Sequence, residues 1–121
     1  MTVIFYASLE APSSTTNTTW TDHVSKSGIL NARPHWLWVY AEYGGINTNR
    51  NVAIRVLING MEIAFDYHQP SVSGEYRSFS TMAEVTPLSD GSLYTATLQY
   101  VAQASPQTAL IRRARLMLMQ Q

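Results

Sequence analysis

The chain has 121 residues, of which 45% are hydrophobic and only 13% are charged, and it contains no cysteine. Eight basic and eight acidic side chains give a formal net charge of zero at pH 7. These numbers exclude a disulfide framework and a cysteine-based zinc site, and the excess of cations typical of nucleic-acid-binding proteins is missing. We expect one domain over residues 1–121, and so little surface charge favours association with a partner or an oligomer.

No targeting or membrane-spanning segment is expected in this sequence. Met1–Tyr6 has no basic residue and no long apolar run, so it does not resemble a cleaved signal. The longest uncharged stretch, residues 91–111, carries Thr, Ser and Gln side chains throughout, and this polarity does not suit a lipid span. The patch at residues 13–19 contains only Ser, Thr and Asn, and we expect it to form a flexible loop.

Most of the chain alternates apolar and polar residues with a period of two, and no stretch keeps a helical repeat. In the first run, Val3, Phe5, Ala7 and Leu9 are predicted to share one face of a strand. The predicted strands cover residues 3–9, 35–41, 51–58, 61–68, 76–85, 93–102 and 108–119, with short strands or turns at 20–24 and 29–30. Seven to nine strands without an intervening helix predict an all-β fold, an antiparallel β-sandwich or a barrel.

The dipeptide Asn59-Gly60 joins two of these alternating runs and predicts a β-hairpin. A type I′ turn needs positive φ at both central residues, and Asn followed by Gly meets this need best. In the second run, 61–68, the alternation assigns Phe65 and Tyr67 to the buried face and the even-numbered residues to the solvated outer face.

The most plausible chemical cluster lies in the same run. Glu62, Asp66 and His68 share a face by alternation, and they could ligate a metal or move protons if that face lined a cavity. We expect a solvated outer face instead. The chain also lacks a nucleophile elbow and a phosphate-cradling glycine loop. We therefore expect no catalytic residues, no metal and no cofactor, and hence no enzymatic activity.

Trp36, Trp38 and Tyr40 fall on one side of the strand predicted at 35–41, whose other side is also apolar. Either this strand is buried on both sides, or its aromatic side meets something outside the protomer. A row of exposed aromatic rings could stack on sugar rings. Packing in the core or in a subunit interface is the favoured interpretation.

Three arginines, Arg112, Arg113 and Arg115, cluster in the last predicted strand. Simple alternation places Arg113 and Arg115 on one face and Arg112 on the other. Arginine suits interface ion pairs, because its planar guanidinium bonds a carboxylate at two points. Ion pairing within the domain or across a subunit contact is favoured over nucleic-acid binding, which needs more cations and a wider patch.

The order of motifs in the C-terminal half resembles a known family. It comprises a strand opening with Tyr76-x-x-Phe79, the Asp90-Gly91 turn, a strand at residues 97–100 and a closing strand at residues 109–116 that contains I-R-R-A-R-L. This order is similar to that of the small jelly-roll structural domains of tailed-bacteriophage virions, over roughly residues 29–121. The resemblance implies a jelly-roll β-sandwich that sits on a virion, commonly as a trimer, and performs no chemistry.

Two functions follow as expectations. The first is a decoration, or cement, protein that binds and stabilises the phage head shell. Its partner would be the major capsid protein or another virion protein, and it would be made in the host cytoplasm before reaching the capsid surface. The second is a carbohydrate-recognition module, of a tail or an adhesin, that uses the aromatic strand. Location in the head, neck or tail is left open by the residues, as is the docking surface.

Overall fold

The computed structural model describes residues 2–121, which form nine strands and no helix. Hence this part of the chain has no helix long and apolar enough to cross a membrane. The strands are β1 (Thr2–Leu9), β2 (Ser13–Thr15), β3 (Thr21–Leu30), β4 (His35–Gly45), β5 (Val52–Ile58), β6 (Met61–His68), β7 (Glu75–Val85), β8 (Ser92–Ala102) and β9 (Ala109–Gln120).

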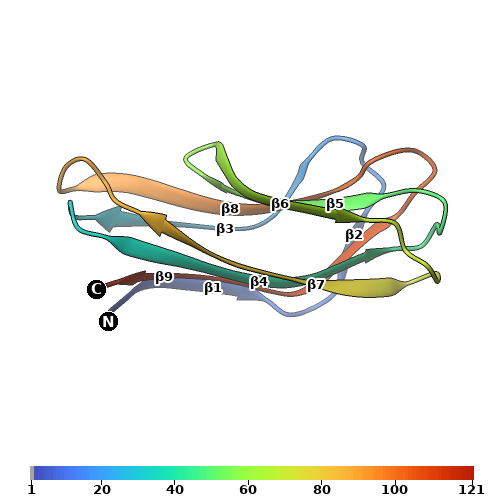
Figure 1. Ribbon diagram of the computed structural model, residues 1–121, viewed down its shortest axis with the longest axis horizontal. Coiled ribbons are helices and arrows are strands. Elements are labelled where there is room, and N and C mark those ends of the chain that lie inside the picture. Colours follow the sequence, from blue (N-terminus) through green and yellow to red (C-terminus); the bar gives the residue numbers. More distant parts are fainter. Residues whose placement is uncertain (1) are drawn as a thin grey trace.

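These strands form two antiparallel sheets packed as a sandwich (Figure 1). One sheet has the order β1-β9-β4-β7, with β2 also pairing with β9, and the other has the order β3-β8-β5-β6. From β2 onward the chain changes sheet at every connection except the β5–β6 hairpin. This is jelly-roll topology. The predicted all-β, antiparallel, jelly-roll-like sandwich of seven to nine strands is therefore confirmed.

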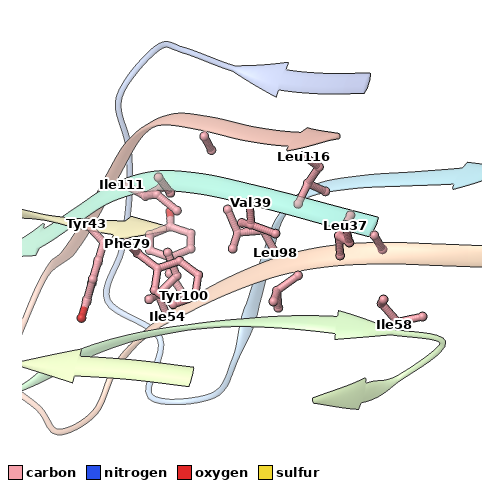
Figure 2. Packing of buried hydrophobic residues seen from close by; sticks show 14 of the residues in the cluster. Leu37, Val39, Tyr43, Ile54, Ile58, Phe79, Leu98, Tyr100, Ile111 and Leu116 are labelled. Carbon is pink, nitrogen blue, oxygen red and sulfur yellow. The ribbon is translucent and has the colours of Figure 1, made fainter. Parts of the chain in front are cut away.

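The core lies between the two sheets and is supplied mainly by the strands at their centres (Figure 2). Leu37 and Val39 from β4, Ile54 from β5, Leu98 from β8 and Leu116 from β9 are all fully buried. Each alternates with a residue that points to the outside of its sheet, because successive strand side chains face opposite ways. This alternation fixes which residues the two outer faces carry.

The β5–β6 hairpin turns at Asn59 and Gly60, whose φ angles are 50° and 78°. Both are positive, as the predicted type I′ turn requires. Pairing within the hairpin then shifts by one residue, because Val56 faces Ala64 whereas Leu57 faces Glu62. This leaves Ile63 as an extra residue in β6.

That extra residue reverses the faces predicted for the rest of β6. Phe65 and Tyr67 are 45% and 55% exposed, so their predicted burial is wrong. Asp66 and His68, predicted to face solvent, point toward the interior, and His68 is buried. Glu62 precedes the bulge and is exposed, as predicted.

Three predictions for the N-terminal part of the chain also differ from the structure. Ser13–Thr15, expected within a flexible loop, forms β2 and pairs with the start of β9. A shift between Val3 and Phe5 leaves Val3 exposed while Phe5 is buried, so the single face predicted for the first run is wrong. Apart from Trp20, the short segments expected at 20–24 and 29–30 are parts of one strand, β3, which pairs along its length with β8.

The strand β4 also runs beyond the predicted range 35–41, through Gly44 and Gly45. These glycines allow the neighbouring backbone to come close. A Cβ atom on Gly44 would lie 1.9 Å from the carbonyl oxygen of Glu75 on β7. The close approach keeps β4 paired with β7 to its last residue.

Replacing Leu98 by Ala should destabilise the fold by about 2–5 kcal/mol, because it removes a fully buried side chain and leaves a cavity between the sheets. Urea unfolding measures this loss. The control is Leu88→Ala, at a fully exposed leucine, where a change within about 0.5 kcal/mol is expected. Equal losses in the two variants would contradict the core assignment.

Candidate functional site

The outer face of the sheet β1-β9-β4-β7 carries the aromatic row expected from the sequence. Trp36, Trp38 and Tyr40 alternate along β4 with side chains that are buried in the core, and their own side chains are partly exposed. The ring centroids of Trp38 and Tyr40 lie 6.4 Å apart, and the planes differ by only 16°. The strand is thus central in its sheet, with one side in the core and the aromatic side facing outward.

Strand register places mainly methionines beside the two tryptophans, with one carboxylate, that of Glu84 on β7, beside Trp36. Met119 lies beside Trp36, while Met117 and Met82 flank Trp38 on its two sides. On β1, Val3 pairs with Met119 and Tyr6 with Met117. We call this surface the aromatic–methionine patch; it consists of Val3, Tyr6, Trp36, Trp38, Met82, Met117 and Met119. Val3, Tyr6 and Met82 are each about half exposed, so the patch lies open to solvent.

The three arginines lie next to this patch on the same sheet. Arg113 has a positive φ of 51°, and the register with β4 shifts between Tyr40 and Glu42. This bulge places Arg112 beside Glu42 and Arg115 beside Tyr40, so both reach the outer face. The predicted division, with Arg112 on the face opposite Arg115, is wrong because alternation does not anticipate the bulge.

Glu42 is the centre of the arginine cluster. It accepts hydrogen bonds from the Tyr40 hydroxyl at 2.7 Å, from Arg112 Nε at 2.7 Å and from Arg113 Nη1 at 3.3 Å. The bonds from Tyr40 and the two arginines lower the pKa of Glu42 from 4.5 to about 2. The Arg112 guanidinium also lies 3.8 Å above the centre of the Tyr76 ring.

Arg115 makes a second, separate pair with Glu10, which follows β1. Its Nη2 and Nε donate to the two carboxylate oxygens at 2.6 and 3.2 Å, a bidentate geometry. The hydrogen bond from Arg115 lowers the pKa of Glu10. All three arginines therefore make ion pairs within the chain, which is one of the two arrangements the sequence favours.

Asp66 and His68 hold a buried tyrosine between the sheets. The Tyr43 hydroxyl donates to Asp66 Oδ2 at 2.7 Å, and His68 Nε2 donates to the Tyr43 carbonyl at 3.2 Å. Burial, followed by the hydrogen bond to Asp66, raises the pKa of Tyr43. Arg77 lies 3.7 Å from the same carboxylate oxygen. Across residues 2–121, no three His, Asp or Glu side chains are grouped as they would be to hold a metal ion.

The structure also brings together side chains from distant parts of the sequence. Trp20, Arg55, Phe65 and Tyr67 meet on the outer face of the other sheet. Trp20 precedes β3 and Phe65 lies on β6, at opposite edges of that sheet. The aromatic pair at positions 65 and 67 was visible in the sequence, but alternation assigned it to the interior.

No protein-family model matches the chain, and no curated protein matches it. Among solved structures it is similar to dimeric latent PorU of Porphyromonas gingivalis, with a TM-score of 0.60 and 8% identity over 99% of this chain and 13% of that one. The Cry4Aa toxin of Bacillus thuringiensis gives a TM-score of 0.52 and 11% identity, over 91% and 21% of the two chains. A cyclase from Fischerella sp. TAU gives 0.52 and 12%, over 79% and 55%.

The chain thus spans about half or less of each of these proteins. At such low identities the likeness concerns the fold alone. These proteins include a toxin and a cyclase, which share no activity, and the same sandwich supports many functions. The outer faces of the chain itself are therefore the features that bear on its function.

Substituting Glu42 by Gln should lower stability at pH 7 by about 1 kcal/mol, because Arg112 and Arg113 lose their charged partner. The folded-state pKa of about 2 lies below the ordinary 4.5, so the ionised carboxylate stabilises the fold above pH 4.5 and this contribution is lost as pH falls toward 2. The difference between the two proteins should therefore shrink from pH 4.5 to pH 2.

Urea unfolding at pH 7, 4 and 2 measures this effect. The matched control is Glu84→Gln, an exposed carboxylate on β7 of the same sheet, which should change little at any pH. A stability difference for Glu42→Gln that stays constant down to pH 2 would contradict the role of its charge.

Proposed function

We propose that this protein is a non-enzymatic binding protein that docks on a protein surface through the outer face of β1-β9-β4-β7. More specifically, it is a decoration protein that binds the head shell of a tailed bacteriophage. The observation that carries the docking proposal is the aromatic–methionine patch, an apolar surface built on the central strands of a sheet and left open to solvent.

The composition of the patch favours a protein partner. Aromatic side chains, methionine and arginine are the residues enriched at the centres of protein interfaces. Here Trp36, Trp38 and their methionine neighbours form the centre, and the arginine cluster forms one border. Because Glu42 and Glu10 already neutralise arginines there, the border can be covered without leaving those charges unpaired.

The phage shell as partner rests on the resemblance of residues 29–121 to virion jelly rolls. A shell repeats the same docking site many times, so a small trimer would gain affinity by engaging several capsid subunits together. The low charge of the chain suits a protein that works by burying area. On this proposal its partner is the major capsid protein or another virion protein, and it resides on the capsid surface.

Carbohydrate binding by the same aromatic strand is the second candidate. The near-parallel rings of Trp38 and Tyr40 favour it, since parallel rings suit stacking on sugars. However, binding sites for sugars also need polar groups that fix the hydroxyls. The side chains next to Trp36 and Trp38 on β9 are methionines, so this surface fits an apolar protein contact better.

Introducing a charge at Met82, which is 56% exposed in the patch, tests the proposal. Met82→Glu should reduce binding to shells lacking the protein by about tenfold or more, because a carboxylate would be buried without a partner. Binding is measured by co-sedimentation of the purified protein with such shells, and its oligomeric state by light scattering.

Leu88→Glu is the control, since Leu88 is fully exposed in the turn between β7 and β8, and this variant should bind like the parent. Equal binding of Met82→Glu and the parent would remove the patch as the docking surface. Failure of the parent itself to bind any shell would overturn the decoration proposal.

A further inference from the structure

The outer face of the second sheet, β3-β8-β5-β6, has a different composition from the patch. Register places Asp22, Gln99, Arg55 and Phe65 in one row across its four strands. Tyr67 lies two residues beyond Phe65 on the edge strand β6. Charged and amide groups therefore lie directly beside exposed aromatic rings, whereas most neighbours of the tryptophans in the patch are methionines.

Three aromatic rings are contiguous on this face. The centroid of the Trp20 ring lies 6.1 Å from that of Phe65, and Phe65 lies 5.8 Å from Tyr67. Ala53 and Val101 belong to the outward-facing set of β5 and β8, yet both are buried. Because Trp20 precedes β3 at the far edge and reaches Phe65, its indole crosses this part of the sheet. The partly buried Trp20 ring therefore lies next to the more exposed rings of Phe65 and Tyr67.

The polar groups next to the rings are held in fixed positions. Arg55 Nε donates to Gln99 Oε1 at 2.7 Å, and Gln99 Nε2 donates to Asp22 Oδ1 at 2.7 Å. Arg55 also lies 3.6 Å from Glu62 and stacks over Trp20 at 4.3 Å. These contacts orient the side chains in advance, so a ligand does not have to order them.

Hydroxyl groups continue the polar surface along the strands. Ser25 and Thr97 pair across β3 and β8 at 3.1 Å, and Ser27 and Thr95 pair at 2.6 Å. Each hydroxyl pair retains acceptor capacity, because a hydroxyl has one donor and two acceptor sites. The face thus runs from aromatic rings, through charged and amide groups, to a ladder of hydroxyls.

The charge of this face selects among ligand classes. One guanidinium, that of Arg55, pairs with Glu62 and is linked through Gln99 to Asp22. Two carboxylates around one cation do not attract nucleic acid, phosphate or sulfated polymers. A neutral ligand with apolar ring faces and many hydroxyls complements stacking rings beside donors and acceptors of both kinds.

We propose that this face is a binding site for a neutral oligosaccharide, whose sugar rings stack on Phe65 and Tyr67 while Asp22, Arg55 and Gln99 bond their hydroxyls. The site lies on the sheet opposite the aromatic–methionine patch and does not depend on the docking proposal. A protein bound to a particle through one sheet would present this site on its other side.

Isothermal titration calorimetry of the full chain tests the site, with cellohexaose, xylohexaose, maltohexaose, mannohexaose and chitohexaose as probes. At least one probe should bind. Tyr67→Ala should weaken that binding about tenfold or more, because it removes an exposed stacking ring. Tyr67→Phe keeps the ring, so its dissociation constant for the sugar should stay within about threefold of that of the parent.

The matched control is Tyr6→Ala, since Tyr6 is 49% exposed on the opposite sheet against 55% for Tyr67. It should leave sugar binding unchanged, and thermal unfolding confirms that both variants fold. Absence of binding to all five probes overturns the proposal, as do equal losses from Tyr6→Ala and Tyr67→Ala. Loss of shell binding in Tyr67→Ala without any sugar binding would identify this face as a protein contact and also overturn it.

Discussion

Burial of apolar side chains between the central strands of the two sheets is the constraint on which the other features depend. Leu37, Val39 and Leu116 on one sheet and Ile54 and Leu98 on the other are fully buried. Because side chains alternate along a strand, the residues next to these buried ones must point to the outside of the sheet. The aromatic row of β4 and the Arg55–Gln99 row both face outward for this reason, although they lie on opposite surfaces.

The sequence was sufficient to predict the sandwich, but not every face of every strand. Alternation and the Asn59-Gly60 turn are local signals, so the strands and the hairpin could be recognised. A bulge adds one residue to one strand and leaves no such signal. Ile63 and Arg113 are ordinary residues in sequence, yet each reverses the orientation of the residues beyond it.

The candidate surfaces were predictable to different degrees for the same reason. Trp36, Trp38 and Tyr40 precede the irregularity in β4 pairing, so their common face follows from spacing alone. Phe65 and Tyr67 follow a bulge, so alternation predicts the buried face for them although they are exposed. Trp20 joins them across the width of a four-stranded sheet, a contact between residues 45 positions apart that periodicity cannot reveal.

The placement of the three tryptophans has an optical consequence. Trp20 lies on one outer face and Trp36 and Trp38 lie on the other, and none belongs to the buried core cluster. Intrinsic fluorescence of this chain therefore reports on its two surfaces. The Trp20→Phe variant isolates emission from the β4 pair, and the double variant Trp36→Phe/Trp38→Phe isolates emission from Trp20. Each binding face thus carries its own native fluorophore, without an attached dye.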